Sequence, residues 1–241
     1  MSTTDGAPAL RLVRTAAYEA HGLGPNVQRK LAALGDLLLG AEFNVTGLSD
    51  PEAIEERHFL DSLSLLAVPP VASSAELADI GSGAGLPALI LALALPTTRV
   101  TAIESVRKKC GYIERAAETL GLENVVVRCM RAEEYGRSAG REAHDVVVSR
   151  ALAALPVVAE YSLPLLRIGG VMIAMKGAVS DQEHTQATNA LGILGGGELS
   201  AMRLDPFEGS DNRWAYRAEK IRATPAEFPR RPGVPAKRPL G

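Results

Sequence analysis

The stretch Asp79-Ile80-Gly81-Ser82-Gly83-Ala84-Gly85-Leu86-Pro87 joins a predicted strand, Glu76–Ile80, to a predicted helix, Leu86–Leu95. Its glycines allow a tight turn and let a ligand approach the backbone closely, because they carry no Cβ. The amino end of the following helix then directs backbone N–H groups at that ligand. This strand–loop–helix unit predicts an α/β fold with a nucleotide-like ligand at the loop.

The sequence on both sides of the glycine loop alternates short apolar runs with helical stretches. The runs that read as strands are Glu76–Ile80, Arg99–Glu104, Asn124–Cys129, Asp145–Ser149 and Val171–Met175. Helices are predicted at Leu86–Leu95, Val106–Leu120 and Leu155–Leu166. This alternation predicts a parallel sheet with helices on both faces. Farther along, Gly195-Gly196-Gly197 and then Ala215–Ile221 predict an antiparallel hairpin at the sheet edge.

Prolines mark boundaries that divide the chain into three parts. Residues 1–70 read as a helical extension, with helices predicted from Ala9, from Pro25 and from Asp50-Pro51, and Pro69-Pro70 ends it. Residues 71–224 form the predicted ligand-binding domain. Residues 225–241 contain five of the 15 prolines, so we predict an extended tail that does not pack against the rest.

The composition is that of a globular protein with one large domain and an extension. The 241 residues are 46% hydrophobic and 22% charged, and the formal charge of −2 argues against a broadly basic face for nucleic acid. Cations do gather near the end of the chain. Arg230, Arg231 and Lys237 there are candidates for contacts with RNA phosphates, or they are only the charges of a solvated tail.

Several classes of protein are disfavoured. No stretch reaches the about 20 apolar residues of a membrane helix, and the first residues lack the basic-then-apolar pattern of a secretion signal. We therefore expect a cytoplasmic protein that does not bind membranes, with a monomer as the default. Cys110 and Cys129 have no CxxC spacing and no neighbouring histidine. We expect no metal site and no disulfide, and place both cysteines in the core as reduced residues.

An acidic residue downstream narrows the identity of the ligand. Glu104 ends the second predicted strand, 23 residues after Gly81, where a carboxylate accepts hydrogen bonds from both hydroxyls of a ribose. Leu86 occupies the position where a dinucleotide fingerprint needs Gly or Ala. Asp79 suits an ammonium group better than a pyrophosphate. A ligand with a ribose and an amino-acid end fits, which indicates S-adenosylmethionine; the alternative is a glycine turn without a ligand.

Other candidate site residues follow the third, fourth and fifth predicted strands, and two more lie in the helical extension that precedes the sheet. Glu133 follows the third strand, where it either accepts from an adenine amino group or only begins a helix. Arg150 and Lys176 end the fourth and fifth strands, so both border the same crevice. Arg150 there either holds a phosphate or lines the acceptor site, and Lys176 either contacts an RNA phosphate or is a solvated lysine at the edge. His58 and Asp61 share one helix face and either reach the crevice or dock the extension onto the sheet domain.

These residues resemble those of a known family, the bacterial small-subunit ribosomal RNA guanine-N7 methyltransferases, historically called glucose-inhibited division protein B. The resemblance spans about residues 26–241. Its matching segments are Asn44-Val45-Thr46, Arg57-His58-Phe59-Leu60-Asp61-Ser62, Asp79–Pro87, Arg131-Ala132-Glu133, Asp145–Ala151, Lys176-Gly177, Pro229-Arg230-Arg231-Pro232-Gly233, Lys237 and Pro239-Leu240. Many methyltransferases share the glycine loop, whereas the Arg-His-Phe-Leu-Asp-Ser segment and the tail are more specific.

The resemblance implies a Rossmann-like fold of the class I S-adenosylmethionine-dependent methyltransferases, with a mostly parallel seven-stranded sheet. It also implies methyl transfer to N7 of one guanine in the 530 loop of 16S ribosomal RNA, within the 30S subunit or as free RNA. Cofactor contacts carried over by position are Gly81, Leu86, Ala132, Glu133 and Arg150; Gly83 and Glu104 are added from the fold argument. Many relatives have Asp where Glu104 stands.

The resemblance does not supply a catalytic base, so Arg150, Lys176 and His58 are only candidates for catalysis. Guanine N7 carries a lone pair and no proton to remove, so positioning alone accounts for much of the acceleration. Three alternatives remain open: a small-molecule methyltransferase with the same cofactor, a non-catalytic ribosome-assembly factor, and a nicotinamide oxidoreductase, which Leu86 disfavours.

Overall fold

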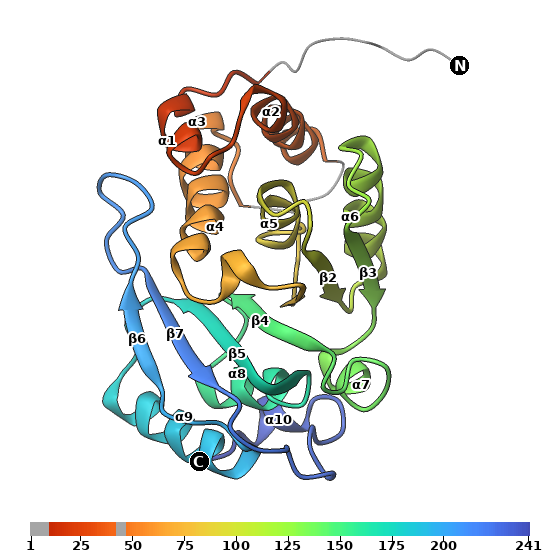
Figure 1. The fold of residues 1–241 in the computed structure, drawn as a ribbon, viewed down its shortest axis with the longest axis vertical. Helices are drawn as coiled ribbons and strands as arrows, with labels where there is room; N and C mark the ends of the chain where they lie inside the picture. Colours follow the sequence, from red (N-terminus) through yellow and green to blue (C-terminus); the bar gives the residue numbers. More distant parts are fainter. Residues whose placement is uncertain (1–9, 42–46) are drawn as a thin grey trace.

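The structure is a computed structural model that describes residues 10–41 and 47–241. The Asn44-Val45-Thr46 segment of the family resemblance therefore lies outside the described residues. Seven strands form one sheet in the order β3-β2-β1-β4-β5-β7-β6 (Figure 1). The strands are β1 (Glu76–Ile80), β2 (Arg99–Glu104), β3 (Val125–Cys129), β4 (His144–Arg150), β5 (Leu166–Lys176), β6 (Ser200–Arg203) and β7 (Trp214–Glu219).

The sheet is parallel except at one edge, as the sequence predicts. Strands β1 to β5 pair in parallel, whereas β7 runs antiparallel between β5 and β6. The predicted hairpin at the sheet edge is thus confirmed. Strand order reverses between β1 and β4, which are neighbours although β2 and β3 separate them in sequence. Ligands of open α/β sheets bind at the carboxyl ends of the strands at such a reversal.

Helices cover both faces of the sheet because each central strand is apolar on both sides. Leu77 and Val146 belong to one buried cluster, while their chain neighbours Ala78 and Val147 belong to the other. Side chains alternate between faces along a strand, so both faces must be covered. The amino-terminal helices with α5 (Ala88–Ala94) and α6 (Arg107–Thr119) pack on one face, and α8 (Leu155–Ser162) with α9 (Asp181–Leu194) pack on the other.

The amino-terminal extension is one set of helices docked on the sheet domain. Its elements are α1 (Thr15–Ala20), α2 (Pro25–Leu39), α3 (Pro51–Ile54), a π-helical turn (Glu55–Leu60), α4 (Asp61–Leu63), and short 3₁₀ turns at Ser64–Ala67 and Val71–Ser73. The first helix begins six residues later than the predicted Ala9 start. The extension shares its hydrophobic core with α5, so it is part of the sheet domain's packing (Figure 1). π-helical turns occur mostly at functional sites.

Two sequence predictions about the second half of the chain need correction. The predicted helix Leu155–Leu166 ends at Ser162. Leu166 instead begins β5, which pairs with β4 in parallel and with β7 in antiparallel orientation. Helix α9 was not predicted. Its sequence is rich in Thr, Gln and Asn, and it buries mainly small residues such as Ala187 and Ala190.

The prediction of an extended, unpacked tail is wrong. Phe228 and Pro235 are buried, and a short helix, α10 (Val234–Lys237), packs beside α8. The Arg230 guanidinium pairs with the Glu160 carboxylate, whose side chain is 0% exposed. Proline content predicts an extended chain, but it does not reveal an ion-pair partner 70 residues away.

No helix in residues 10–41 and 47–241 is both long and apolar enough to cross a lipid bilayer.

Candidate functional site

Two pockets meet at the carboxyl ends of β1 and β4, where the strand order reverses. The cofactor pocket, as we name it, has a volume of about 340 Å³ and lies over the loop that follows β1. The acceptor pocket, also about 340 Å³, lies under the amino-terminal helices at the ends of β4 and β5. Binding sites of this size hold small organic ligands.

The cofactor pocket collects five of the predicted cofactor residues. Gly81, Gly83, Glu104, Ala132 and Glu133 all contribute to its wall. They come from the ends of β1, β2 and β3, which meet at one edge of the sheet although more than 50 residues separate the first from the last. This placement confirms that the residues share one pocket; their contacts with a cofactor remain a prediction.

The glycine loop requires glycine for conformational and steric reasons. Gly81 and Gly83 have φ values of 71° and 58°, in the left-handed region that side chains other than glycine rarely adopt. A Cβ on Gly81 would lie 2.5 Å from Cδ1 of Leu152, which also lines the cofactor pocket. The first glycine is therefore more restricted than the second, whose Cβ would meet no atom closer than 3.8 Å.

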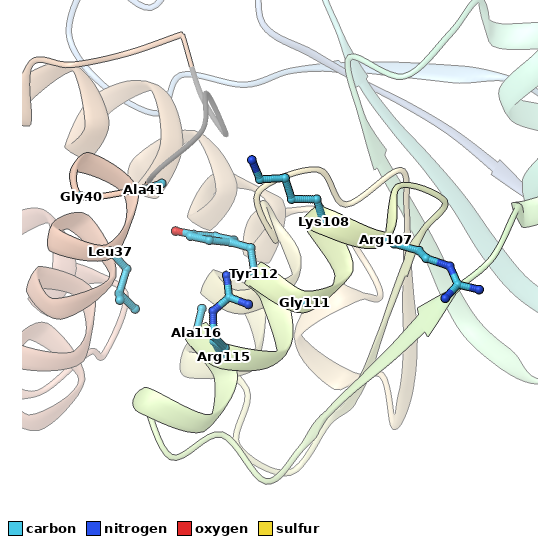
Figure 2. Close-up of a pocket in the computed structure, with 9 residues that line it drawn as sticks. All are labelled: Leu37, Gly40, Ala41, Arg107, Lys108, Gly111, Tyr112, Arg115 and Ala116. Atoms are coloured by element: carbon cyan, nitrogen blue, oxygen red, sulfur yellow. The ribbon is translucent and has the colours of Figure 1, made fainter. Parts of the chain in front are cut away.

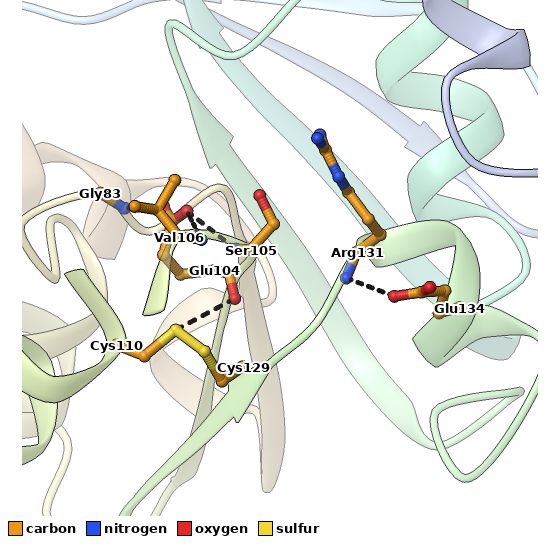
Figure 3. Close-up of a disulfide and its surroundings, with 8 residues drawn as sticks. All are labelled: Gly83, Glu104, Ser105, Val106, Cys110, Cys129, Arg131 and Glu134. Atoms are coloured by element: carbon orange, nitrogen blue, oxygen red, sulfur yellow. Dashed lines mark hydrogen bonds between the residues drawn. A yellow bond between two sulfur atoms is a disulfide. The ribbon is translucent and has the colours of Figure 1, made fainter. Parts of the chain in front are cut away.

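Backbone N–H groups hold the Glu104 carboxylate in the pocket wall (Figure 3). Its Oε2 accepts from the Gly83 N–H at 2.9 Å, and its Oε1 accepts from the Ser105 and Val106 N–H groups at 2.7 and 2.8 Å. Each carboxylate oxygen has further lone-pair capacity, so the group can still accept from ribose hydroxyls. The Glu104 carboxylate therefore lines the pocket with backbone N–H donors on both of its oxygens, and its contact with a ribose remains a prediction.

A disulfide beside Glu104 contradicts the expectation of two reduced cysteines. Cys110, in the first half of α6, bonds to Cys129, the last residue of β3, with 5.7 Å between the Cα atoms (Figure 3). Cys129 is directly opposite Glu104 in the sheet, and α6 packs against β3. The chain returns over 19 residues to bring the sulfur atoms together, which no CxxC-type spacing announces.

Asp79 lies beneath the glycine loop and outside the pocket wall. Its side chain is fully buried, Oδ2 accepts from the Ala88 N–H at 3.3 Å, and Oδ1 has no hydrogen-bond partner among the described residues. Burial raises the pKa of this carboxyl to about 6, although hydrogen bonds from Ser82 and Ala88 act in the opposite direction. A buried carboxylate with an unused oxygen suits a neighbouring cation, as the sequence argument expects.

The carboxyl-terminal tail closes one side of the cofactor pocket. Ala236 of α10 contributes to the wall, and the Gly233 N–H donates to Glu133 Oε1 at 2.9 Å. Tyr161 of α8 lines the same pocket and also interacts with Glu133. Glu133 therefore joins the tail to the pocket, a role that the alternatives of adenine contact or helix start did not include.

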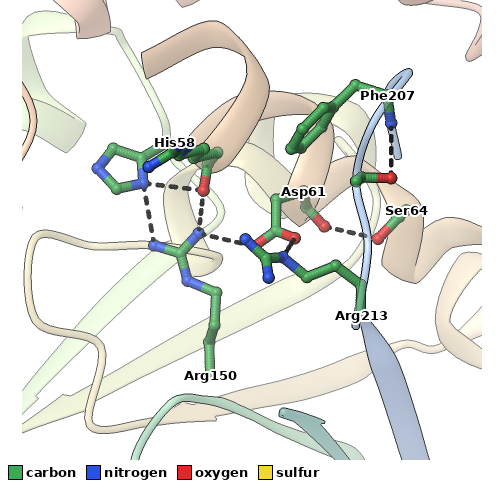
Figure 4. Close-up of polar contacts among 8 residues, drawn as sticks. His58, Asp61, Ser64, Arg150, Phe207 and Arg213 are labelled. Atoms are coloured by element: carbon green, nitrogen blue, oxygen red, sulfur yellow. Dashed lines mark hydrogen bonds and ion pairs between the residues drawn. The ribbon is translucent and has the colours of Figure 1, made fainter. Parts of the chain in front are cut away.

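The acceptor pocket contains the residues for which the sequence left alternatives open (Figure 4). Arg150 Nη1 donates to Asp61 Oδ2 at 3.3 Å and to the Arg57 carbonyl at 3.1 Å, and Nη2 lies 3.5 Å from His58 Nδ1. From the other side, Arg213 Nε donates to Asp61 Oδ1 at 3.1 Å. Asp61 thus docks the extension, and His58 borders the pocket, so both sequence readings apply.

Burial and charge set the protonation of the pocket. Burial and the nearby Arg150 lower the pKa of His58 to about 4, so its imidazole is neutral at pH 7. Burial also lowers the pKa of Arg150, and the Asp61 carboxylate acts against this. Lys176 lines the pocket and donates to Glu183 Oε1 at 2.6 Å and to the Ala153 carbonyl at 2.8 Å.

A larger pocket of about 540 Å³ lies between α2 and α6. Lys108 and Arg115 lie near the ring of Tyr112 there, whereas Arg107 points away from it (Figure 2). None of the residues predicted for the site lines this pocket. The glycine loop and the strand ends therefore identify the candidate site, although the pocket between α2 and α6 is larger.

Comparison with known proteins agrees with this geometry. A family model described as rRNA small subunit methyltransferase G (GidB) matches residues 28–205. The chain belongs to this family. The ribosomal RNA small subunit methyltransferase G of Deinococcus radiodurans is 42% identical over 223 residues, which are 90% of this chain and 87% of that protein. The protein of the same name from Chloroflexus aggregans is 46% identical over 82% of this chain and 83% of its own length.

Solved structures show the same fold at low sequence identity. The S-adenosylmethionine-dependent methyltransferase SibL aligns with a TM-score of 0.57 at 16% identity, over 86% of this chain and 77% of its own. A SAM-dependent O-methyltransferase from Thermotoga maritima has a TM-score of 0.56 at 15% identity, over 80% of this chain and 72% of its own. The chain therefore has the Rossmann-like methyltransferase fold that its sequence predicts.

Three predicted site residues of this family member lie elsewhere than expected. Arg150, a predicted cofactor contact, lines the acceptor pocket and not the cofactor pocket. Leu86, a predicted cofactor contact, is buried in the hydrophobic core and does not line the cofactor pocket. Arg230, a predicted RNA contact, directs its guanidinium at Glu160. The side chains of Arg231 and Lys237 are exposed on the tail.

Sequence reasoning missed Arg213 and Trp214 in the acceptor pocket and Tyr161 in the cofactor pocket. Trp214 is the only tryptophan in the chain and precedes the predicted strand Ala215–Ile221. A rare aromatic residue beside an arginine at a strand start was an available signal. Tyr161 gave none, because it follows the apolar pattern of its helix.

Proposed function

We propose that the protein transfers a methyl group from S-adenosylmethionine to N7 of one guanine in the 530 loop of 16S ribosomal RNA. The observation that carries the proposal is the cofactor pocket: Gly81, Gly83 and Glu104 line it at the strand reversal of a chain that belongs to the rRNA small subunit methyltransferase G family. The names of the 42–46% identical relatives support the same substrate.

The cofactor pocket and the Asp79 side chain below it suit the ribose and the amino-acid end of S-adenosylmethionine. The Glu104 carboxylate accepts from the ribose hydroxyls while backbone N–H groups hold it in place. Gly81 and Gly83 let the ligand lie against the backbone, and the negative field of Asp79 below the loop favours the ammonium group. When bound, the ligand supplies a methyl group on a positively charged sulfur.

The proposed reaction does not require a general base. N7 forms a bond to the methyl carbon as the bond from that carbon to sulfur breaks, and no proton leaves the guanine. His58, with its pKa near 4, is neutral at pH 7 but has no proton to accept in this step. The chain's contribution is to bind and orient the two reactants, which is sufficient for a large effect on rate.

We further propose that a few cations hold the RNA backbone. Lys176 at the acceptor pocket and the exposed Arg231 and Lys237 of the tail are the candidates among the predicted residues. Both pockets lie within one chain, so the proposed active unit is a monomer, working in the cytoplasm where ribosomal RNA is found.

A methyl-transfer assay tests the proposal. Labelled S-adenosylmethionine is incubated with the protein and either undermethylated 30S subunits or deproteinised 16S RNA, and the modified base is mapped. We expect label at one guanine N7 in the 530 loop. Label on neither substrate, together with cofactor binding measured by calorimetry, contradicts the proposal and leaves the assembly-factor alternative.

A further inference from the structure

We propose that the acceptor pocket receives the acceptor guanine itself and that Asp61 is a positioning residue, holding Arg150 and Arg213 to the pocket wall. The inference rests on the proposed function and extends it to the binding site of the base. Segments far apart in the chain build the pocket: the π-helical turn and α4 of the extension, the end of β4, the end of β5, Leu204 after β6, and the start of β7.

The lining of the pocket matches a guanine ring. Trp214, Met175 and Leu204 supply aromatic and apolar surface against which a flipped-out base can stack. Arg150 and Arg213 supply N–H donors to the same pocket. Guanine presents O6 and N7 as acceptors along one edge. Because N7 must keep its lone pair for methyl transfer, O6 is the atom for an arginine donor.

One loop contributes to the walls of both this pocket and the cofactor pocket. Arg150 and Ala151 line the acceptor pocket, and the next residues, Leu152 and Ala153, line the cofactor pocket. Ala151 has φ 49°, a left-handed conformation that is uncommon for alanine, and its N–H donates to the Met175 carbonyl at 3.1 Å. Such strain occurs where the surroundings impose it, often at functional sites. The turn thus borders both pockets, so the two ligands can meet beside a single backbone segment.

Among the described residues that line the acceptor pocket, only Asp61 contacts both Arg150 and Arg213. Its carboxylate, in a residue 5% exposed, receives Arg150 Nη1 on one oxygen and Arg213 Nε on the other (Figure 4). Two guanidinium groups at one pocket wall repel each other, and the carboxylate between them offsets that repulsion. The known contacts of Arg150 use three of its five donors, which leaves donors for a base.

A purely structural role for Asp61 is the competing explanation, because the same contacts dock the extension. Asp145 offers a matched control at the opposite end of β4. Its carboxylate pairs with Arg167 at 3.0 Å and accepts from the Ala75 and Glu76 N–H groups at 3.0 and 2.9 Å. Asp145→Asn therefore weakens a similar set of contacts far from both pockets.

The first test measures kcat and KM for RNA at saturating cofactor. We expect Asp61→Asn to lower kcat/KM at least tenfold, with cofactor Kd within twofold of the parent, and Asp145→Asn to leave both values within twofold. Asp61→Glu should recover part of the loss. The double variant Asp61→Asn/Arg150→Lys should be less than threefold worse than its worse single variant, because Asp61→Asn already releases Arg150, one of the two guanidinium groups that Asp61 holds. Multiplying losses, or an Asp61→Asn protein that behaves like Asp145→Asn, overturns the inference.

The second test does not depend on turnover. Since Trp214 is the only tryptophan, its fluorescence reports directly on a base that enters the pocket. With S-adenosylhomocysteine bound, GMP should quench at a half-saturating concentration at least threefold below that of AMP, whose amino group replaces O6. Asp61→Asn should remove this preference. Equal quenching by both nucleotides, or none, contradicts the guanine site. A parent protein that methylates no RNA but prefers GMP would contradict only the proposed function.

Discussion

The ion pair between Arg230 and Glu160 predicts that one tail residue controls both stability and cofactor binding. Glu160 of α8 has a side chain that is 0% exposed, and it accepts from the Arg230 backbone N–H at 2.8 Å and from the guanidinium Nε and Nη2 at 2.9 and 2.5 Å. Burial of an unpaired carboxylate is strongly unfavourable. Arg230→Ala removes the counter-charge and leaves Glu160 in place.

The structure sets the expected magnitude. Breaking a buried ion pair on one side costs about 3–5 kcal/mol, because the remaining charge stays buried without a partner. For a chain of this length that corresponds to a fall in Tm of about 6–20 °C. The tail also supplies Ala236 to the cofactor pocket and the N–H that Glu133 accepts. Cofactor affinity should therefore fall together with stability.

Urea unfolding and calorimetric titration with S-adenosylmethionine measure the two effects. Replacing both partners, in Glu160→Met/Arg230→Met, should recover most of the lost stability, since no charge remains buried. Arg203→Ala is the matched control, because Arg203 pairs with Asp205 at the surface, where such pairs contribute about 0–1 kcal/mol. An Arg230→Ala protein as stable as the Arg203→Ala control would refute the reasoning.

Four further predictions concern the glycine loop, two buried titratable residues and the cations of the tail. Gly81→Ala should weaken cofactor binding at least tenfold in calorimetry, because a φ of 71° strains any residue with a Cβ and that Cβ would displace Leu152, which lines the cofactor pocket; unchanged binding contradicts the loop geometry. Asp79→Asn should raise the free energy of unfolding at pH 8 by about 3 kcal/mol while weakening cofactor binding, because burial holds the pKa of Asp79 near 6 and the native state is penalised once it ionises. Burial holds the pKa of His144 near 4, so the unfolded state takes up a proton first and stability falls as pH drops from about 6.5 to 4; His144→Gln should flatten this dependence in urea titrations by up to about 3 kcal/mol. Arg231→Ala/Lys237→Ala should reduce the slope of log affinity for RNA against log salt by about 1.4 if both side chains contact phosphates, and an unchanged slope excludes those contacts.

The sheet and the cofactor pocket were predictable because their signals are local. Strands such as Arg99–Glu104 are short apolar runs between turn residues, and β2 has these same bounds in the structure. The glycine loop and Glu104 each follow a strand, so the parallel arrangement alone brings them to one edge of the sheet. Local patterns of this kind determine position without knowledge of long-range contacts.

The remaining features depend on partners that are distant in sequence. Glu160 and Arg230 are 70 residues apart, and nothing near either residue shows that the other neutralises it. The Asp61–Arg213 contact spans 152 residues. The sequence predicts two separate core cysteines, because no local pattern shows that α6 packs against β3 and brings the two sulfur atoms together. Composition predicted an extended tail for the same reason: it describes the segment alone.

The three charged residues of the acceptor pocket that contact one another come from three distant pieces of the chain, which has a consequence for protein engineering. The extension supplies Asp61, the end of β4 supplies Arg150 and the start of β7 supplies Arg213, so no continuous segment carries the whole pocket. A chimera that joins the first 70 residues of one relative to the sheet of another separates a carboxylate from the guanidinium groups fitted to it. The smallest graft that preserves acceptor recognition therefore includes all three pieces together. The cofactor pocket cannot be exchanged as a block either, because its wall extends from Gly81 to Ala236 and includes Leu152 and Ala153 beside Arg150.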